Sequence, residues 1–174
     1  VNYFLNKCIF DEVWLVISPQ NPLKKNLDIL NIYERIKIIK KSISNKKKIK
    51  ICLDELKLPK PNYTISTLQF FKKKYSKNKF KIILGEDNLH SFKEWKDSTN
   101  IIDNFSICVY PRNEKINGSD FIIHDNLKIL NTAPKIDISS TKIRDYISNG
   151  IDVKKYLPKD SFEYIIEKKF FNKS

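Results

Sequence analysis

Val13-Trp14-Leu15-Val16-Ile17, closed by Ser18-Pro19, is the stretch that decides the fold class of this chain. It is a continuous apolar run of the length of one β-strand. Runs of this kind are typical of strands that are buried on both faces of a parallel sheet. The run therefore predicts a strand inside such a sheet, with helices covering it on either side.

Strand-like and helix-like segments alternate along the rest of the chain. Further strands are predicted at residues 49–53, 80–84, 105–110 and 127–130, and helices at 29–43, 64–75, 141–149 and 160–170. The helix predictions rest on apolar residues that recur every three or four positions. Strands that alternate with helices indicate an α/β protein with a doubly wound, mostly parallel sheet and helices on both faces.

The composition excludes several classes of protein. The chain has 174 residues, 41% of them hydrophobic and 12% aromatic, which is enough for a core in a single domain spanning residues 1–174. No apolar run reaches the roughly 18 residues of a membrane span, and no signal peptide is evident. Three widely spaced cysteines indicate reduced thiols in the cytoplasm, and two histidines are too few for a histidine-rich metal cluster.

The net charge of +13 raises the question of nucleic-acid binding. Its lysines are scattered, apart from short clusters at 46–48 and 72–74, and no known nucleic-acid-binding motif accompanies them. Anionic small-molecule substrates fit the charge equally well. A non-catalytic, basic nucleic-acid-binding module therefore remains the less favoured alternative.

The segment Ile136-Asp137-Ile138-Ser139-Ser140-Thr141-Lys142-Ile143-Arg144 carries the strongest chemical signal. Ser139 or Ser140 can cap a helix that starts here, and the free N–H groups of its first turn suit an anion. Arg144 lies one turn further along the same face and can bind a phosphate with two parallel hydrogen bonds. The segment predicts a polyphosphate site, although an ordinary helix cap with a solvated arginine fits the same pattern.

Other distinctive residues follow predicted strands. Lys24 follows the first, Gly85 and Asp87 follow the strand at 80–84, and Ser139 and Ser140 follow the last. Ligands of doubly wound sheets bind at the carboxyl ends of the strands, so these residues are expected on one rim. The alternatives are a tight turn at Gly85, a helix cap at Asp87 and a solvated surface lysine at Lys24.

Two aromatic positions have similar alternatives. Trp95 lies in a polar neighbourhood, so its ring can be a core side chain or a platform that stacks on a flat heterocycle. Tyr63-Thr64 can be simply the entry to a helix that Thr64 caps.

Taken together, four segments resemble the bacterial nicotinate-nucleotide adenylyltransferases, which belong to the nucleotidylyltransferase superfamily and have a Rossmann-like sheet. The similarity covers nearly all of the chain, with the motifs in the family's order. They are Pro61-Asn62-Tyr63-Thr64-Ile65-Ser66-Thr67-Leu68, Ile83-Leu84-Gly85-Glu86-Asp87 with Phe92-Lys93-Glu94-Trp95, Ile138-Ser139-Ser140-Thr141-Lys142-Ile143-Arg144, and Lys154-Lys155-Tyr156-Leu157-Pro158 with Tyr164-Ile165.

The resemblance implies adenylyl transfer from ATP, with Mg²⁺, to nicotinate mononucleotide, giving deamido-NAD and pyrophosphate in NAD biosynthesis. It implies a cytoplasmic enzyme without a membrane partner or a protein-bound metal, and it leaves assembly into a homo-oligomer open. The implied catalytic residues are Arg144 and Asp87, and the implied mononucleotide-binding residues are Tyr63, Thr64, Trp95 and Asp87. The implied ATP-binding residues are Gly85, Ile138, Ser139, Ser140, Thr141, Arg144 and Lys24.

The chain departs from the family in three places. It lacks the phosphate-binding G-x-F-x-P-x-H-x-G-H segment of the first strand and helix, has Asn21-Pro22-Leu23-Lys24-Lys25 where Pro-Pro-His followed by a basic residue is common, and has Lys96 where an aromatic residue often follows the tryptophan. Without that first strand, the strands at 13–17 and 80–84 are expected to have unpaired edges, and the polypeptide as written to be poorly stable and inactive. Another nucleotidylyltransferase, such as a pantetheine-phosphate enzyme, is the nearest alternative.

Overall fold

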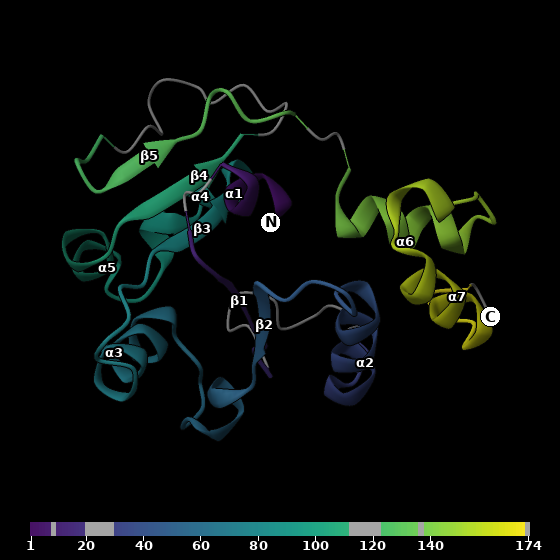
Figure 1. Cartoon of the computed structure of the whole chain (residues 1–174), viewed down its shortest axis with the longest axis horizontal. Helices are drawn as coiled ribbons and strands as arrows, with labels where there is room; N and C mark the ends of the chain where they lie inside the picture. The colour runs from purple at the N-terminus through teal and green to yellow at the C-terminus, as the bar shows by residue number, and fades with distance from the viewer. Residues whose placement is uncertain (8–9, 20–29, 112–122, 136–137, 173–174) are drawn as a thin grey trace. The chain divides into compact units, whose positions relative to one another are not determined.

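The computed structural model of the chain describes residues 1–7, 10–19, 30–111, 123–135 and 138–172. The chain forms two compact units. The first unit comprises Val1–Pro19, Lys24–Lys57 and Ile138–Ser174, and the second comprises Gln20–Leu23 and Leu58–Asp137. Each unit is described by itself, with its elements labelled in Figure 1.

The sheet of the first unit has two parallel strands. β1 (Val13–Val16) pairs with β2 (Ile49–Cys52) in a register that sets Val13 opposite Ile49 and Val16 opposite Cys52. A short helix, α1 (Asn2–Asn6), precedes them, and a 3-10 turn, η1 (Asp54–Lys57), follows. The apolar run that starts at Val13 thus forms a parallel strand, as predicted.

Three helices pack together in the first unit. They are α2 (Ile32–Ser42), α6 (Ser140–Ser148) and α7 (Lys159–Glu167), with a 3-10 turn, η4 (Lys154–Tyr156), before the last. Ile147, Val153 and Ile165 form a small buried core, against which Ile38 of α2 also packs. The helices α2 and α7 lie side by side (Figure 1), and the Tyr164 hydroxyl donates a 2.5 Å hydrogen bond from α7 to Glu34 of α2.

The sheet of the second unit has three parallel strands in the order β3 (Ile82–Gly85), β4 (Ile107–Tyr110) and β5 (Leu127–Ile129). β4 pairs on both sides, with Gly85 of β3 opposite Tyr110 and Leu127 of β5 opposite Ile107. In this central strand, the residues Ile107, Cys108 and Val109 are buried. The continuous apolar pattern of the strand follows from that burial.

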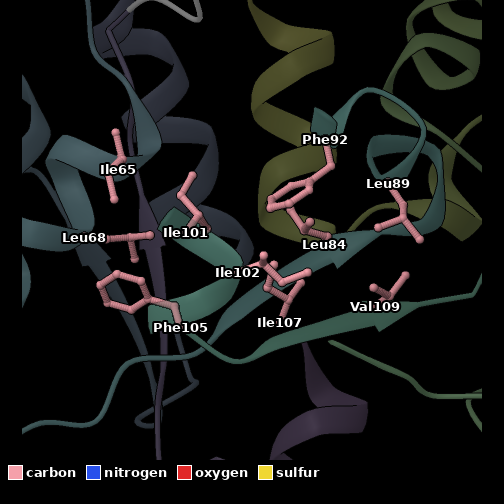
Figure 2. Close-up of a cluster of buried hydrophobic side chains, with 10 residues drawn as sticks. All are labelled: Ile65, Leu68, Leu84, Leu89, Phe92, Ile101, Ile102, Phe105, Ile107 and Val109. Carbon is pink, nitrogen blue, oxygen red and sulfur yellow. The ribbon is translucent and has the colours of Figure 1, made fainter. Parts of the chain in front are cut away.

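The helices of the second unit are α3 (Thr64–Lys74), α4 (Glu86–Leu89) and α5 (Ser98–Asn104), with a 3-10 turn, η2 (Phe92–Glu94), between the last two. Side chains from these elements and from β3 and β4 form one buried cluster (Figure 2). Its members are Ile65, Leu68, Leu84, Leu89, Phe92, Ile101, Ile102, Phe105, Ile107 and Val109. The helices α4 and α5 were not predicted, because these short, polar segments have no clear apolar period.

The observed pairings match the predicted class of fold. Every strand pair is parallel, and helices lie between β1 and β2, between β2 and β3 and between β3 and β4, as in the α/β prediction. Among the described residues, β1 pairs only with β2 and β3 only with β4, as expected for strands with one unpaired edge. Gly150 follows Asn149, the C-cap residue of α6, and has a φ of 71°, the left-handed conformation that commonly ends a helix. In the part of the chain that the structure describes, no helix is long and apolar enough to cross a membrane.

Candidate functional site

The start of α6 is capped by Ser139. Its Oγ accepts a 3.1 Å hydrogen bond from the backbone N–H of Lys142, and its extended backbone (φ −127°, ψ 162°) is typical of a cap residue. Ser140, the other candidate, is the first helical residue and is exposed. The helix therefore begins as the sequence predicts. The hydroxyl of Ser139 satisfies one N–H group at the helix start, that of Lys142. The N–H groups of Ser140 and Thr141 remain at the positive end of the helix dipole.

Arg144 is held at this same turn. Its Nη2 donates a 3.1 Å hydrogen bond to Oγ1 of Thr141, one turn toward the helix start. Helical side chains point back toward the N-terminus, so the guanidinium lies over the first turn. No carboxylate of the described residues forms an ion pair with it. Within the described residues, its positive charge therefore lies beside the free amides without a neutralising carboxylate. We call the segment Ser139–Arg144 the anion-binding turn.

The apolar face of α6 fixes the direction of this turn. Ile147 is buried in the small core of the first unit, and Ile143 and Tyr146 pack against it. The residue before the cap, Ile138, is partly buried. Lys24, the weaker phosphate candidate, lies outside the described residues.

A further arginine supports the loop that follows β1. Nη1 of Arg35, in the first turn of α2, donates a 2.9 Å hydrogen bond to the backbone carbonyl of Ser18. Asn31 caps the same helix by accepting a hydrogen bond from the N–H of Glu34 at 3.0 Å. The role of Arg35 was not predicted from the sequence, because a backbone carbonyl acceptor leaves no signal in the pattern of side chains.

In the second unit, β3 ends at Gly85 and α4 follows at once. The backbone of Gly85 (φ −77°, ψ 150°) is one that any residue adopts, so the tight turn does not require glycine here. A glycine at the strand end still leaves room for close approach to the backbone. Asp87 is not a helix cap, since Gly85 is the cap residue, and Asp87 lies exposed in the first turn of α4.

The start of α3 also differs from the prediction that Thr64 caps this helix. Thr64 is the first helical residue, and the cap position belongs to Tyr63, whose side chain makes no capping hydrogen bond. The carbonyl of Tyr63 accepts hydrogen bonds from the backbone N–H of Thr67 at 3.2 Å and from its Oγ1 at 3.4 Å. The hydroxyl of the buried Thr67 thereby adds a second bond that fixes the backbone of Tyr63.

Trp95 is both a packing residue and a partly exposed ring. One side packs against the buried cluster of the second unit, and its ring centroid lies 5.4 Å from that of Phe92. Tyr63 packs against the same cluster, and Nζ of Lys96 lies 4.5 Å from the centroid of the Tyr63 ring. We call Tyr63, Trp95 and Lys96 the ring-binding surface.

The two groups of residues have different chemistries. The anion-binding turn offers amides, hydroxyls and a guanidinium, which suit a polyphosphate. The ring-binding surface offers aromatic faces and an ammonium, which suit a flat heterocycle with an anionic substituent. The two belong to different units, so the prediction that they share one rim stays a prediction. In the described residues, no group of three or more His, Cys, Asp or Glu side chains is placed to hold a metal ion.

Comparison with known proteins places the chain in a family. The cytidylyltransferase-like family model matches residues 7–146. The "Probable nicotinate-nucleotide adenylyltransferase" of Flavobacterium psychrophilum is 38% identical over 173 residues, which are 99% of this chain and 89% of that relative. The protein of the same name from Cytophaga hutchinsonii is 37% identical over 162 residues, which are 93% of this chain and 83% of that relative.

A solved structure shows the same fold. The Plasmodium falciparum nicotinic acid mononucleotide adenylyltransferase complexed with NaAD matches with a TM-score of 0.74 at 22% identity, over 98% of this chain and 89% of that one. The parallel strands and connecting helices described above are thus those of a Rossmann-like nucleotidylyltransferase fold. By its sequence relatives, the chain belongs to the cytidylyltransferase-like family and, within it, to the nicotinate-nucleotide adenylyltransferases.

Proposed function

We propose that this protein transfers the adenylyl group of ATP to nicotinate mononucleotide, which yields deamido-NAD and pyrophosphate in NAD biosynthesis. Membership of the family supports the reaction. The observation that carries it is the anion-binding turn, where Arg144 lies against Thr141 beside a helix start that Ser139 caps.

The reaction needs no nucleophile from the protein. A phosphate oxygen of the mononucleotide attacks the α-phosphorus of ATP, a new phosphorus–oxygen bond forms, and the bond between the α-phosphorus and the bridging oxygen of the β-phosphate breaks. Pyrophosphate leaves with the negative charge that develops on this bridging oxygen. Catalysis then consists of positioning the two nucleotides and neutralising charge in the transition state.

Residues of the first unit are proposed to bind ATP. The guanidinium of Arg144 and the backbone N–H groups of Ser140 and Thr141 bind the phosphates, and Ser139 keeps that turn in place. The backbone of Ile138 contacts the adenine, and Lys24 is a further phosphate ligand. Arg144 is the catalytic residue of this set, because its charge faces the phosphates as negative charge develops on the leaving group.

Residues of the second unit are proposed to bind the mononucleotide. Trp95 stacks on the pyridine ring, and the backbone of Tyr63 and Thr64 binds the ring carboxylate. The exposed carboxylate of Asp87 accepts hydrogen bonds from sugar hydroxyls, whereas Gly85, counted among the ATP-binding residues, admits a nucleotide sugar close to the strand end. Asp87 thereby holds a reacting nucleotide in position.

Magnesium is proposed to enter as part of the substrate, bound to the phosphates of ATP. In this form the ion needs few protein ligands, since Mg²⁺ keeps several of its waters and takes oxygens from the phosphates. The basic character of the chain, with a net charge of +13, favours the approach of both anionic nucleotides.

Pyrophosphate release tests the proposal. The purified full-length protein is given ATP and Mg²⁺ with nicotinate mononucleotide, nicotinamide mononucleotide or 4′-phosphopantetheine. We expect release with a clear preference for the nicotinate form. Release with phosphopantetheine alone would assign a different acceptor. No release with any acceptor, together with steeply salt-dependent binding to DNA or RNA, would favour a nucleic-acid-binding module.

A further inference from the structure

Lys96 is the charged member of the ring-binding surface, and it follows Trp95 directly in the chain. The Lys96 ammonium lies 4.5 Å from the centroid of the Tyr63 ring, within the range of an attractive cation–π contact. Residues more than thirty positions apart in the sequence are thus brought together at the start of α3.

The charge of Lys96 is not neutralised by a carboxylate. Among the described residues none forms an ion pair with it, and its side chain is exposed. A cation–π contact leaves the full positive charge on the ammonium, because the ring contributes only its quadrupole. The contact therefore holds the charge in place without cancelling it.

The start of helix α3 is a second source of positive potential beside Tyr63. Tyr63 is the cap residue of α3, an 11-residue helix, and its side chain makes no capping hydrogen bond to the first N–H groups of that helix. The positive end of the α3 dipole and the ammonium of Lys96 therefore both lie at Tyr63. Trp95, the neighbour of Lys96 in the chain, is the aromatic ring of the same surface.

We propose that Lys96 is a specificity-determining residue, whose ammonium over Tyr63 favours a mononucleotide with an anionic ring carboxylate over one with a neutral carboxamide. The inference rests on the proposed function and deepens it. The carboxylate gains from the ammonium and from the helix start, whereas the carboxamide carries no net charge. Because Lys96 is exposed and screened by water, we expect a discrimination of about threefold to tenfold from this residue.

The test compares Lys96→Met with Lys96→Arg and with Lys93→Met. Methionine keeps the apolar stem over Tyr63 and removes the charge, whereas arginine keeps the charge. Lys93 is a matched control, because it is an exposed lysine three residues earlier in the same segment. Binding of nicotinate and nicotinamide mononucleotide to the full-length protein is measured by calorimetric titration at low and high salt, together with kcat and KM of pyrophosphate release.

In Lys96→Met, the Kd and KM for the nicotinate form should rise about threefold to tenfold, with kcat and the values for the nicotinamide form nearly unchanged. Lys96→Arg should restore the preference, Lys93→Met should keep it, and high salt should reduce it in the unmodified protein. An equal loss for both mononucleotides would overturn the inference, since it would indicate only a structural support for Tyr63. An unchanged preference would overturn it as well.

Failure of the proposed function gives a different pattern. A protein that releases no pyrophosphate but binds the nicotinate form through Lys96 would disprove adenylyl transfer and support the role of Lys96. A protein that releases pyrophosphate with a preference insensitive to Lys96→Met would do the reverse. A protein that binds neither mononucleotide would overturn both.

Discussion

The anion-binding turn and the ring-binding surface are built in opposite ways. In the turn, the hydrogen bonds of the Ser139 hydroxyl and of the Arg144 guanidinium each join residues three positions apart, from Ser139 to Lys142 and from Thr141 to Arg144. The surface instead joins Tyr63 to Lys96 across two separate segments that pack on one buried cluster. The turn is therefore encoded locally, whereas the surface depends on the tertiary structure of its unit.

The difference predicts how the two respond to substitution. A change in the turn should alter binding or catalysis with little effect on the rest of the protein, since its polar side chains lie at the surface of one helix. A change in the ring-binding surface should alter stability and function together, because Trp95 and Tyr63 also cover the buried cluster. The predictions below test that contrast.

The largest effect is expected from Arg144→Ala. The guanidinium makes a hydrogen bond to the exposed Thr141 and no ion pair within the described residues, so its loss should leave the melting temperature almost unchanged. Removing a preorganised group that stabilises transition-state charge typically costs about 100- to 1,000-fold in rate. We expect a loss of that size in kcat/KM for ATP, measured by pyrophosphate release.

Thr141→Val is the matched control for Arg144. Valine keeps the shape of threonine and removes the oxygen that anchors the guanidinium. The loss should be severalfold, well below that of Arg144→Ala. A large drop in melting temperature in either variant would contradict the local character of the turn.

Trp95→Ala should have the next largest effect. Stacking of an aromatic side chain on a base contributes about 1–3 kcal/mol, which is roughly 5- to 150-fold in affinity. We expect KM for the mononucleotide to rise within that range, with a smaller change in KM for ATP. The variant should also lose about 1–3 kcal/mol of stability, because a half-buried ring leaves the cluster.

Phe92→Leu separates packing from stacking. Phe92 is 2% exposed and contacts Trp95 in the cluster, so leucine perturbs the packing and leaves the stacking ring in place. Melting curves should show destabilisation with KM for the mononucleotide changed much less. Equal changes in KM in both variants would show that Trp95 acts through packing alone.

The features that depend on neighbours in the chain could be predicted from the sequence, whereas the contacts between distant segments could not. The apolar run at Val13 and the cap at Ser139 depend on neighbours in the chain, and both were confirmed. The contact of Lys96 with Tyr63 and the bond from Arg35 to Ser18 join distant segments. Neither leaves a periodic signal, and a single lysine or arginine is interpreted as an ordinary surface residue until the fold is known.

A smaller effect is expected at Ser139, where two substitutions separate the cap from the charge. Ser139→Ala removes the hydrogen bond to the N–H of Lys142 and should cost about 1 kcal/mol of stability. Ser139→Asp keeps a capping oxygen and hence the stability, but it places a carboxylate where phosphates are proposed to bind. Activity should fall further in the aspartate variant, even though its melting temperature is the higher of the two.

The smallest effect concerns the contact between two helices of the first unit, where Tyr164 of α7 donates its hydrogen bond to Glu34 of α2. This bond, with Lys37 nearby, lowers the pKa of Glu34 below its ordinary value of 4.5. The same bond raises the pKa of Tyr164 above its ordinary value of 10.0. Both shifts favour the pair in which Glu34 is ionised and Tyr164 is protonated.

The pH dependence follows from the signs of the two shifts. A lowered carboxyl pKa contributes stability that is present above pH 4.5 and is lost as the pH falls through the folded-state value. A raised phenol pKa contributes stability that is present below pH 10.0 and is lost as the pH rises through the folded-state value. Melting temperatures should therefore fall at both ends of the range, and Tyr164→Phe should flatten both slopes. If hydrogen exchange in Tyr164→Phe sped up as much in α3 of the second unit as in α2, the hydrogen bond would not act locally at the contact between α2 and α7.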